Sequence, residues 1–292
     1  LLLITGPCSI HDIPSTLEYM EKLKTLNARV KDEILILMRF YFEKPRTRFG
    51  WKGFLYDPYL DGSYQMNEGI KQARYLLQQA LEMALGTATE FLDPNMSTYL
   101  EDGICWGCVG ARTSSSPIHR QMASSLHCPI GFKNSLSGDL HTALHAIQTA
   151  NLPNTFPKLI NGKLVAETSN GNPFCHLIMR GSKNKPNFDI ESVKNACKLL
   201  QAHHFFPHVM IDCAHGNGQK LAEKQLDVFE TILPYKDEGL IFGIMLESHL
   251  NFGNQPMSDT LKYGVSITDP CLSFDQLEAS ILTQYSMTGF TH

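Results

Sequence analysis

Long hydrophobic runs are missing from this sequence. Its longest apolar stretches, such as residues 34–38 and 240–246, are far shorter than the roughly 20 residues needed to cross a bilayer. The chain opens on residues 1–5 with neither an initiator Met nor a basic segment, a pattern that is typical of a β-strand rather than of a signal peptide. We therefore expect no membrane span and no membrane partner.

Blocks of basic residues are also absent. The formal net charge is −4, whereas binding to a nucleic-acid backbone usually requires a basic stripe. We expect no nucleic-acid partner. Any phosphate chemistry must then be carried out by a few well-placed cations.

The sequence lacks a disulfide framework. Its eight cysteines have no regular spacing, and no secretory signal precedes them. This pattern fits the reducing cytoplasm better than an oxidising compartment. We therefore expect free thiols and a cytoplasmic protein.

Both common nucleotide-binding fingerprints are missing, since no Gly-x-Gly-x-x-Gly opens a helix and no Walker A loop occurs. What is present is the composition of a globular protein, with 43% hydrophobic and 18% charged residues. A length of 292 residues is ordinary for one large α/β domain. We expect a single domain over residues 1–292.

Apolar segments alternate with amphipathic segments along the whole chain. The apolar patterns predict eight strands, at residues 1–5, 34–41, 87–92, 107–111, 129–133, 174–179, 208–212 and 240–246. Helical periodicity separates them, for example at residues 13–26, 190–201, 221–233 and 274–285. Eight strands that alternate with eight helices favour a closed α/β barrel of the TIM type, (β/α)8, over an open doubly wound sheet.

One segment interrupts this alternation. Residues 156–168 carry Asn161-Gly162 between two apolar runs, which is a signal for a two-residue β-hairpin turn. The sequence therefore predicts a hairpin inserted between the fifth helix, near residues 140–149, and the sixth barrel strand.

Ionisable residues follow the predicted strands. Barrel enzymes place their catalytic groups at the carboxyl ends of the strands, so these side chains should share one rim. They are Cys8, His11, Asp12, Arg39, Glu43, Lys44, Arg46, Glu90, Asp93, Arg112, Lys133, Arg180, Asp212, His215, Glu247 and His249. Their coincidence at one rim indicates an active site.

Six of these residues are cations that would repel one another without an anionic partner. They are Arg39, Lys44, Arg46, Arg112, Lys133 and Arg180. Guanidinium forks suit bidentate contact with phosphate and carboxylate groups. For any single cation the alternative is an ion pair with a local acid, but six at successive strand ends favour a ligand with several negative charges.

A second set of residues combines a thiol, an imidazole and two carboxylates. Its members are Cys8, His215, Glu247 and Asp269. If they meet, such a mixed set suits a borderline divalent ion such as Mn, Fe, Co or Zn better than Ca or Mg. An open coordination position would let the ion polarise a carbonyl group. The alternative for Cys8 is an ordinary buried thiol.

Two further features have ordinary structural explanations. The pair Cys105 and Cys108 forms a CxxC without a second pair, so a zinc ribbon is not expected. Most histidines lie in or beside predicted helices. His119 is kept as a candidate because it closely follows residues 110–113 at the rim.

Several motifs together resemble the class I (type Iα) 3-deoxy-D-arabino-heptulosonate 7-phosphate (DAHP) synthases, over nearly the whole chain. The motifs are Gly6-Pro7-Cys8-Ser9-Ile10-His11-Asp12, the segment 38–47, Gly50-Trp51-Lys52-Gly53, Gly110-Ala111-Arg112-Thr113, Gly131-Phe132-Lys133-Asn134 and Ser266-Ile267-Thr268-Asp269. The resemblance implies a transferase that opens the shikimate pathway of aromatic amino acid biosynthesis. It joins phosphoenolpyruvate to erythrose 4-phosphate and water, and releases phosphate.

The resemblance also implies roles for individual residues. The phosphoenolpyruvate site would comprise Arg39, Gly110, Ala111, Arg112, Lys133 and Arg180. The erythrose 4-phosphate site would comprise Lys44, Pro45, Arg46 and Thr47, with Arg46 and Thr47 on the phosphate. The metal ligands would be Cys8, His215, Glu247 and Asp269. The catalytic candidates for handling protons and charge would be Lys44, Glu90, His215 and Asp269.

The family implies one divalent metal ion per chain, with Mn²⁺ favoured over Fe²⁺, Co²⁺ or Zn²⁺. It also implies a homo-oligomer, either a dimer or a tetramer, with an aromatic amino acid as a candidate effector. Two departures leave control by Phe, Tyr or Trp open. The family's N-terminal extension is absent from this chain, and residues 93–98 and His127 differ from the usual sequence of the regulatory pocket.

Two rival functions are compatible with much of this pattern. The first is 3-deoxy-D-manno-octulosonate 8-phosphate synthase, which uses the same barrel on arabinose 5-phosphate. Lys44-Pro45-Arg46-Thr47 disfavours it, because that family typically has Ala-Asn-Arg-Ser there. The second is a non-catalytic barrel that binds phosphorylated ligands, which would be expected to have lost at least one site residue.

Overall fold

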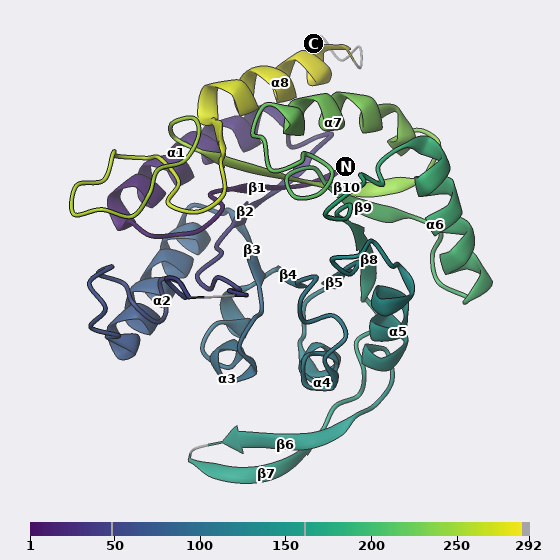
Figure 1. Ribbon diagram of the computed structural model, residues 1–292, viewed down its shortest axis with the longest axis horizontal. Helices are drawn as coiled ribbons and strands as arrows, with labels where there is room; N and C mark the ends of the chain where they lie inside the picture. Colours follow the sequence, from purple (N-terminus) through teal and green to yellow (C-terminus); the bar gives the residue numbers. More distant parts are fainter. Residues whose placement is uncertain (48, 161, 288–292) are drawn as a thin grey trace.

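Eight parallel strands close into a barrel in the computed structural model, which describes residues 1–47, 49–160 and 162–287 (Figure 1). The barrel strands are β1 (Leu2–Gly6), β2 (Leu35–Arg39), β3 (Gly86–Glu90), β4 (Trp106–Val109), β5 (Ile130–Lys133), β8 (His176–Met179), β9 (Val209–Asp212) and β10 (Ile241–His249). Each strand pairs with the next in that order, and β1 also pairs with β10, in register from Leu2 opposite Gly243 to Gly6 opposite Glu247. The predicted closed TIM-type barrel is confirmed.

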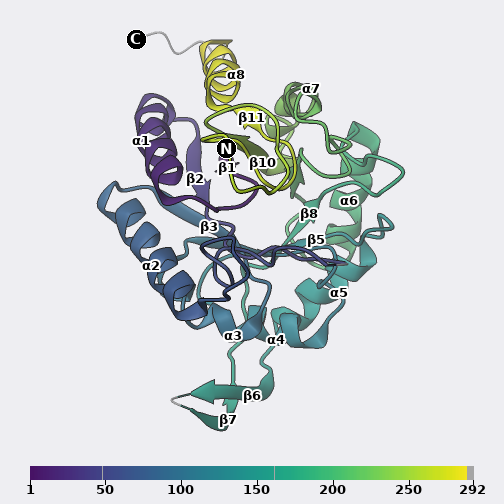
Figure 2. The ribbon, with the colours of Figure 1, turned by 60° about the vertical axis from the view of Figure 1, so that its left-hand side comes forward.

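Helices surround the barrel on its outer side (Figures 1 and 2). They are α1 (Ile13–Val30), α2 (Met66–Glu82), α3 (Pro94–Ser97), α4 (Pro117–Ser125), α5 (His141–Ala150), α6 (Ile190–Ala202), α7 (Lys224–Ile232) and α8 (Phe274–Met287). Short 3₁₀ turns occur at η1 (Glu101–Gly103) and η2 (Leu233–Lys236), and a short strand β11 (Leu272–Ser273) pairs with the end of β10.

Helix α1 shows why an element begins where it does. Asp12 accepts a hydrogen bond from the backbone N of Ser15 at 2.8 Å and so caps the first turn, while Pro14 occupies a position that needs no N–H donor. A buried stripe that includes Tyr19, Leu23 and Leu26 then packs the helix on the barrel.

The core has two layers because side chains on a strand alternate between its two faces. Inside the barrel lies a small cluster with Ile4, Trp106 and Met245 among its members. Their neighbours in sequence, such as Leu3 and Ile244, belong to the larger cluster between the barrel and its helices. This packing holds the strand ends in fixed positions, which a catalytic rim requires.

The predicted hairpin is present. Strands β6 (Thr155–Ile160) and β7 (Lys163–Thr168) pair antiparallel, with Thr155 opposite Thr168. They extend away from the barrel below α4 and α5 (Figures 1 and 2). The predicted turn contains Asn161, which lies outside the described residues.

All eight barrel strands differ from their predicted bounds by one to three residues. Strand β2 ends at Arg39, although the apolar pattern continues, because Phe40 and Phe42 stay in the core after the backbone has left the sheet. Strand β10 continues to His249, three residues beyond the predicted end, since its last residues are polar yet buried. Among the described residues, no helix is long and apolar enough to cross a membrane.

Candidate active site

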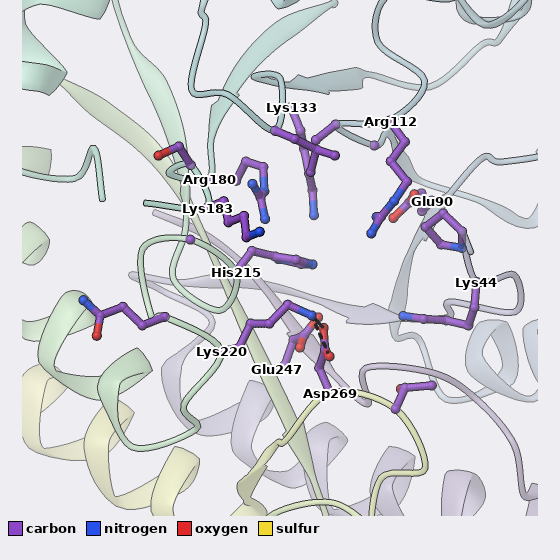
Figure 3. A pocket seen from close by; sticks show the side chains of 18 of the residues that line it. Lys44, Glu90, Arg112, Lys133, Arg180, Lys183, His215, Lys220, Glu247 and Asp269 are labelled. Carbon is purple, nitrogen blue, oxygen red and sulfur yellow. Dashed lines mark hydrogen bonds and ion pairs between the residues drawn. The ribbon is translucent and has the colours of Figure 1, made fainter. Parts of the chain in front are cut away.

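A cavity of about 630 Å³ opens at the carboxyl ends of the barrel strands. Thirteen of the residues named from the sequence line it, namely Arg39, Lys44, Pro45, Arg46, Glu90, Gly110, Ala111, Arg112, Lys133, Arg180, His215, Glu247 and Asp269. Figure 3 shows several of these side chains pointing into the same space from different strands. Thr47 and Cys8 adjoin the cavity through contacts with Arg112 and Lys44. Of the sixteen ionisable residues predicted at the rim, nine line this cavity. The other seven do not, namely Cys8, His11, Asp12, Glu43, Asp93, Asp212 and His249.

Arg39 is the most deeply buried cation of the site. Its guanidinium donates to Oε1 of Glu247 at 2.9 Å and to the backbone oxygen of Pro7 at 3.3 Å, and it lies 3.7 Å from the ring centre of Tyr41. Burial opposes the charge of Arg39, but Tyr41 and Glu247 outweigh it and raise the arginine's pKa. Nη1 of Arg39 has no hydrogen-bond partner among the described residues. A buried donor without a partner is costly, so this nitrogen favours an anionic ligand in the cavity.

Lys133 belongs to a chain of charges across the barrel. Its Nζ lies 2.8 Å from Oδ2 of Asp212, and Nδ1 of His215 lies 2.8 Å from the same oxygen. Burial opposes the charge of Asp212, yet His215 and Lys133 hold its pKa well below the usual value. Likewise, Asp212 outweighs burial and raises the pKa of Lys133. Asp212 keeps Lys133 cationic, and it places the His215 ring nitrogen close to the same carboxylate without a hydrogen bond of good geometry.

The segment after β4 brings the backbone close to Glu90. A Cβ added to Gly110 would displace the carboxylate of Glu90, so glycine lets this carboxylate lie against the backbone. Ser114 donates to the backbone oxygens of Gly110 at 2.9 Å and of Lys133 at 2.8 Å. These bonds tie the ends of β4 and β5 together beneath the predicted phosphoenolpyruvate residues.

The segment after β2 holds the residues predicted to bind the aldose phosphate. Nε of Arg46 donates to the backbone oxygen of Trp51 at 2.8 Å. Thr47 accepts at Oγ1 a hydrogen bond from Nε of Arg112 at 2.9 Å. Residues assigned to the two substrates by resemblance therefore touch each other.

Three of the four candidate metal ligands face a cation. Sγ of Cys8 lies 3.2 Å from Nζ of Lys44, Glu247 is paired with Arg39, and Asp269 is paired with Lys220 at 3.0 Å. Within the described part of the chain, no three or more His, Cys, Asp or Glu residues are grouped closely enough to hold an ion. The four still fit a divalent ion in the chemistry of their donor atoms, and His215, Glu247 and Asp269 line the same cavity. The ligand set therefore stays a prediction.

The decisive comparison is with families of known proteins. The model of the DAHP synthetase I family matches residues 1–281. The chain belongs to the DAHP synthetase I family. This confirms the resemblance drawn from the motifs, together with the transferase activity that it implied.

Several relatives match this chain over most of their length. The chain is 45% identical over 284 residues to a Trp-sensitive phospho-2-dehydro-3-deoxyheptonate aldolase of Escherichia coli (strain K12), covering 95% of this chain and 81% of the relative. It is 43% identical over 286 residues to a Tyr-sensitive one of Salmonella typhimurium, with 96% and 80% covered. The solved structure of a phospho-2-dehydro-3-deoxyheptonate aldolase from Francisella tularensis SCHU S4 aligns with a TM-score of 0.95 at 41% identity, covering 98% of this chain and 85% of that one.

Sequence reasoning missed three cations of this DAHP synthetase I site. Lys183, Lys185 and Lys220 also line the cavity, and Figure 3 shows Lys183 beside Arg180. They lie several residues beyond a strand end, in the loops after β8 and β9, whereas the residues predicted from the sequence lie next to the strand ends. The basic residues of the complete loops are the signal that indicates them.

Two other sequence candidates lie outside the cavity. His119 contacts the backbone oxygen of Leu92 through Nε2 at 2.6 Å and Oγ of Ser116 through Nδ1 at 2.9 Å. Cys105 is exposed and Cys108 is buried, and both are free thiols. Sγ of Cys108 lies 3.1 Å from the hydroxyl of Tyr41. His119 and the CxxC thus make structural contacts.

Proposed function

We propose that this cavity condenses phosphoenolpyruvate with erythrose 4-phosphate and water to give DAHP and phosphate. Membership of the DAHP synthetase I family gives the activity. The observation that carries the assignment to this cavity is the buried Nη1 of Arg39 without a partner, in a space lined by many further cations. The two substrates bring two phosphates and a carboxylate, which is the kind of ligand that such a lining favours.

Phosphoenolpyruvate would lie against the group of Arg39, Lys133 and Arg180, with Arg112 and the backbone of Gly110 and Ala111 closing its other side. Burial lowers the pKa of Arg180, and a bound anion would offset that cost. Because Lys133 is already held by Asp212, it presents a fixed positive charge rather than a mobile one. Preorganised charge of this kind binds the phosphate and carboxylate of phosphoenolpyruvate at little reorganisation cost.

Erythrose 4-phosphate would be held by the segment from Lys44 to Thr47. Arg46 and Thr47 would bind its phosphate, and Lys44 would face the aldehyde end. Nζ of Lys44 is held 2.9 Å from the backbone oxygen of Cys8, deep in the cavity. From there Lys44 could donate to the aldehyde oxygen as it becomes an alkoxide.

The four candidate ligands Cys8, His215, Glu247 and Asp269 would hold one divalent ion, Mn²⁺ before Fe²⁺, Co²⁺ or Zn²⁺. Such an ion supplies Lewis acidity toward the aldehyde carbonyl. The chain's own residues complete the reaction. The enol carbon of phosphoenolpyruvate attacks the aldehyde carbon, water adds at the neighbouring cationic centre, and the carbon–oxygen bond to phosphate breaks. Glu90, which is buried beside Gly110, is suited to position that water or accept its proton, while His215 and Asp269 remain candidates for the other proton transfers.

The remaining partners are proposed from more general observations. All eight cysteines are free, which supports the expected cytoplasmic location. Relatives are named Trp-sensitive and Tyr-sensitive, which supports an aromatic amino acid as a candidate effector of a homo-oligomer.

The proposed function can be tested by measuring phosphate release from phosphoenolpyruvate in the presence of each aldose. We expect release with erythrose 4-phosphate and a divalent ion, and little with arabinose 5-phosphate. Preference for the five-carbon sugar would favour the octulosonate synthase. Binding of phosphoenolpyruvate without any turnover would favour a non-catalytic barrel. Unchanged turnover after exhaustive chelation would contradict the metal requirement.

A further inference from the structure

Glu43 is a buried carboxyl group that has no assigned role. It directly precedes the segment 44–47, its side chain is 2% exposed, and it is not among the residues that line the cavity. A buried carboxyl group needs hydrogen-bond partners. These partners tie it to a different part of the rim.

The partners of Glu43 come from the loop after β3 and from Tyr56. Oε1 accepts hydrogen bonds from the backbone N of Asp93 at 3.2 Å and from the hydroxyl of Tyr56 at 3.3 Å, and Oε2 accepts one from the backbone N of Leu92 at 3.3 Å. The Tyr56 hydroxyl also lies 3.0 Å from Oδ2 of Asp93. Since β3 ends at Glu90, Glu43 fastens the segment after β2 to the loop that follows Glu90.

The segment beyond Glu43 mostly bonds to itself. Lys44 donates its backbone N to the oxygen of Lys52 at 2.9 Å, and Arg46 bonds to Trp51. This loop ends at Gly53, which has a φ of +114° and where an added Cβ would collide with the backbone of Phe42. Glu43 lies at the start of the loop, so its contacts can fix how Lys44 and Arg46 enter the cavity.

We propose that Glu43 is a positioning residue that clamps the aldose-binding segment 44–47 against the loop after β3. The clamp rests on the proposed function, because it assigns the segment to erythrose 4-phosphate. It acts through the backbone and needs no contact with substrate. A displacement of about 1 Å in such a segment can cost up to about a hundredfold in rate.

Burial and hydrogen bonding act on Glu43 in opposite directions. Burial raises the pKa of Glu43 to about 8, although the N–H groups of Leu92 and Asp93 and the hydroxyl of Tyr56 oppose the shift. Asp93 adds to the rise in the pKa of Glu43. Both carboxyl oxygens of Glu43 accept from backbone N–H groups. An amide offers one acceptor oxygen and one N–H donor, so glutamine can reproduce only part of this pattern.

The test compares Glu43→Ala with Glu43→Gln in the metal-loaded enzyme. We expect the alanine variant to raise KM for erythrose 4-phosphate on the order of tenfold, while KM for phosphoenolpyruvate changes less than about twofold. The glutamine variant should restore part of the loss, because its amide oxygen keeps one of the two backbone contacts. Hydrogen exchange of a peptide containing residues 44–47 should be faster in the alanine variant alone. Glu82→Ala, an exposed change on α2, is the matched control.

Each other outcome overturns the clamp. An unchanged KM for the aldose in a folded alanine variant would do so, as would equal losses for both substrates or a glutamine variant as impaired as alanine. Thermal melting and phosphoenolpyruvate binding establish that the variants are folded. Absence of turnover in the unmodified enzyme would instead refute the proposed function, so the two failures are distinguishable.

Discussion

Nζ of Lys44 lies 3.2 Å from Sγ of Cys8 and 2.9 Å from the backbone oxygen of the same residue. The contact joins a candidate metal ligand to a candidate aldose-binding residue. Burial, with Glu247 adding to its effect, raises the pKa of the Cys8 thiol. Cys8 is thus a buried thiol beside a cation at the base of the cavity, which distinguishes it from the chain's ordinary core cysteines.

Replacing Cys8 by serine should remove the metal and keep the fold. We expect metal affinity to fall by about a hundredfold or more, since losing only an outer-shell partner of a metal ligand already costs about 10–100-fold. Turnover should fall with it. Metal content of protein purified without chelator, measured beside a thermal melt, checks this. Cys105→Ser, a change of an exposed thiol, is the control, and a Cys8→Ser enzyme with full metal content would refute the ligand role.

Arg46→Ala should separate the two substrates. We expect KM for erythrose 4-phosphate to rise about 10- to 100-fold, because a charge-assisted contact to phosphate is lost. The KM for phosphoenolpyruvate should change less, because Arg46 contacts Trp51, whereas the contact from this segment to Arg112 is made by Thr47. Steady-state kinetics with each substrate varied in turn measures both constants, and equal losses would contradict the division of the cavity between Arg46 and Arg112.

Much of the fold could be predicted from the sequence because buried parallel strands leave a strong apolar signal. This signal predicts the eight barrel strands, whereas the inserted hairpin is predicted from the turn signal Asn161-Gly162. Strand ends were harder to predict where the apolar pattern in the sequence and the hydrogen-bonded strand end at different residues. Phe40 remains in the core outside the sheet, and Ser248 and His249 are polar yet belong to β10. The pattern of apolar residues in a sequence reflects which side chains are buried, and it does not show directly where the backbone hydrogen bonds of a strand end.

The members of the site could also be predicted, but their pairing could not. Sequence order indicates that Asp212 and Lys133 both end strands, yet only the closure of the barrel brings them to 2.8 Å. The clamp at Glu43 was equally hidden, because it depends on backbone N–H groups, which every residue except proline carries. Lys183 and Lys185 were missed because a lysine in a polar loop usually has no role beyond solubility.

Lys183 and Lys185 should steer substrates toward the cavity. Replacing both by methionine should lower kcat/KM for both substrates about fivefold at low ionic strength, because cations at a mouth raise the encounter rate with anions. The difference should shrink at high salt, where screening reduces the attraction. Kinetics over a salt series measures this, with Lys198→Met on α6 as the control. A loss that salt does not reduce would indicate direct binding instead.

His176 should make the fold sensitive to acid. Its Nε2 lies 3.1 Å from the indole N–H of Trp106, which can only donate, and its Nδ1 lies 3.0 Å from the backbone oxygen of Phe174, which can only accept. The ring is therefore neutral, with its proton on Nδ1. Burial lowers the pKa of His176 from 6.5 to about 4. Between these two values the unfolded chain takes up a proton that the folded chain does not, so the free energy of unfolding falls as pH drops from about 6.5 to about 4.

The variant His176→Phe should lack this part of the pH dependence. At pH 7 it should be less stable by about 1 kcal/mol, because the Trp106 N–H loses its acceptor. Below pH 6 the difference in the free energy of unfolding between the variant and the unmodified protein should become smaller. Only the unmodified protein loses stability there, because its His176 stays neutral in the folded state while it takes up a proton in the unfolded state. Urea unfolding at a series of pH values measures this difference, with the exposed His127→Gln as the control. If the difference in the free energy of unfolding stays constant from pH 7 to pH 4.5, His176 titrates alike in the folded and unfolded states. That outcome would contradict its role as the source of acid sensitivity.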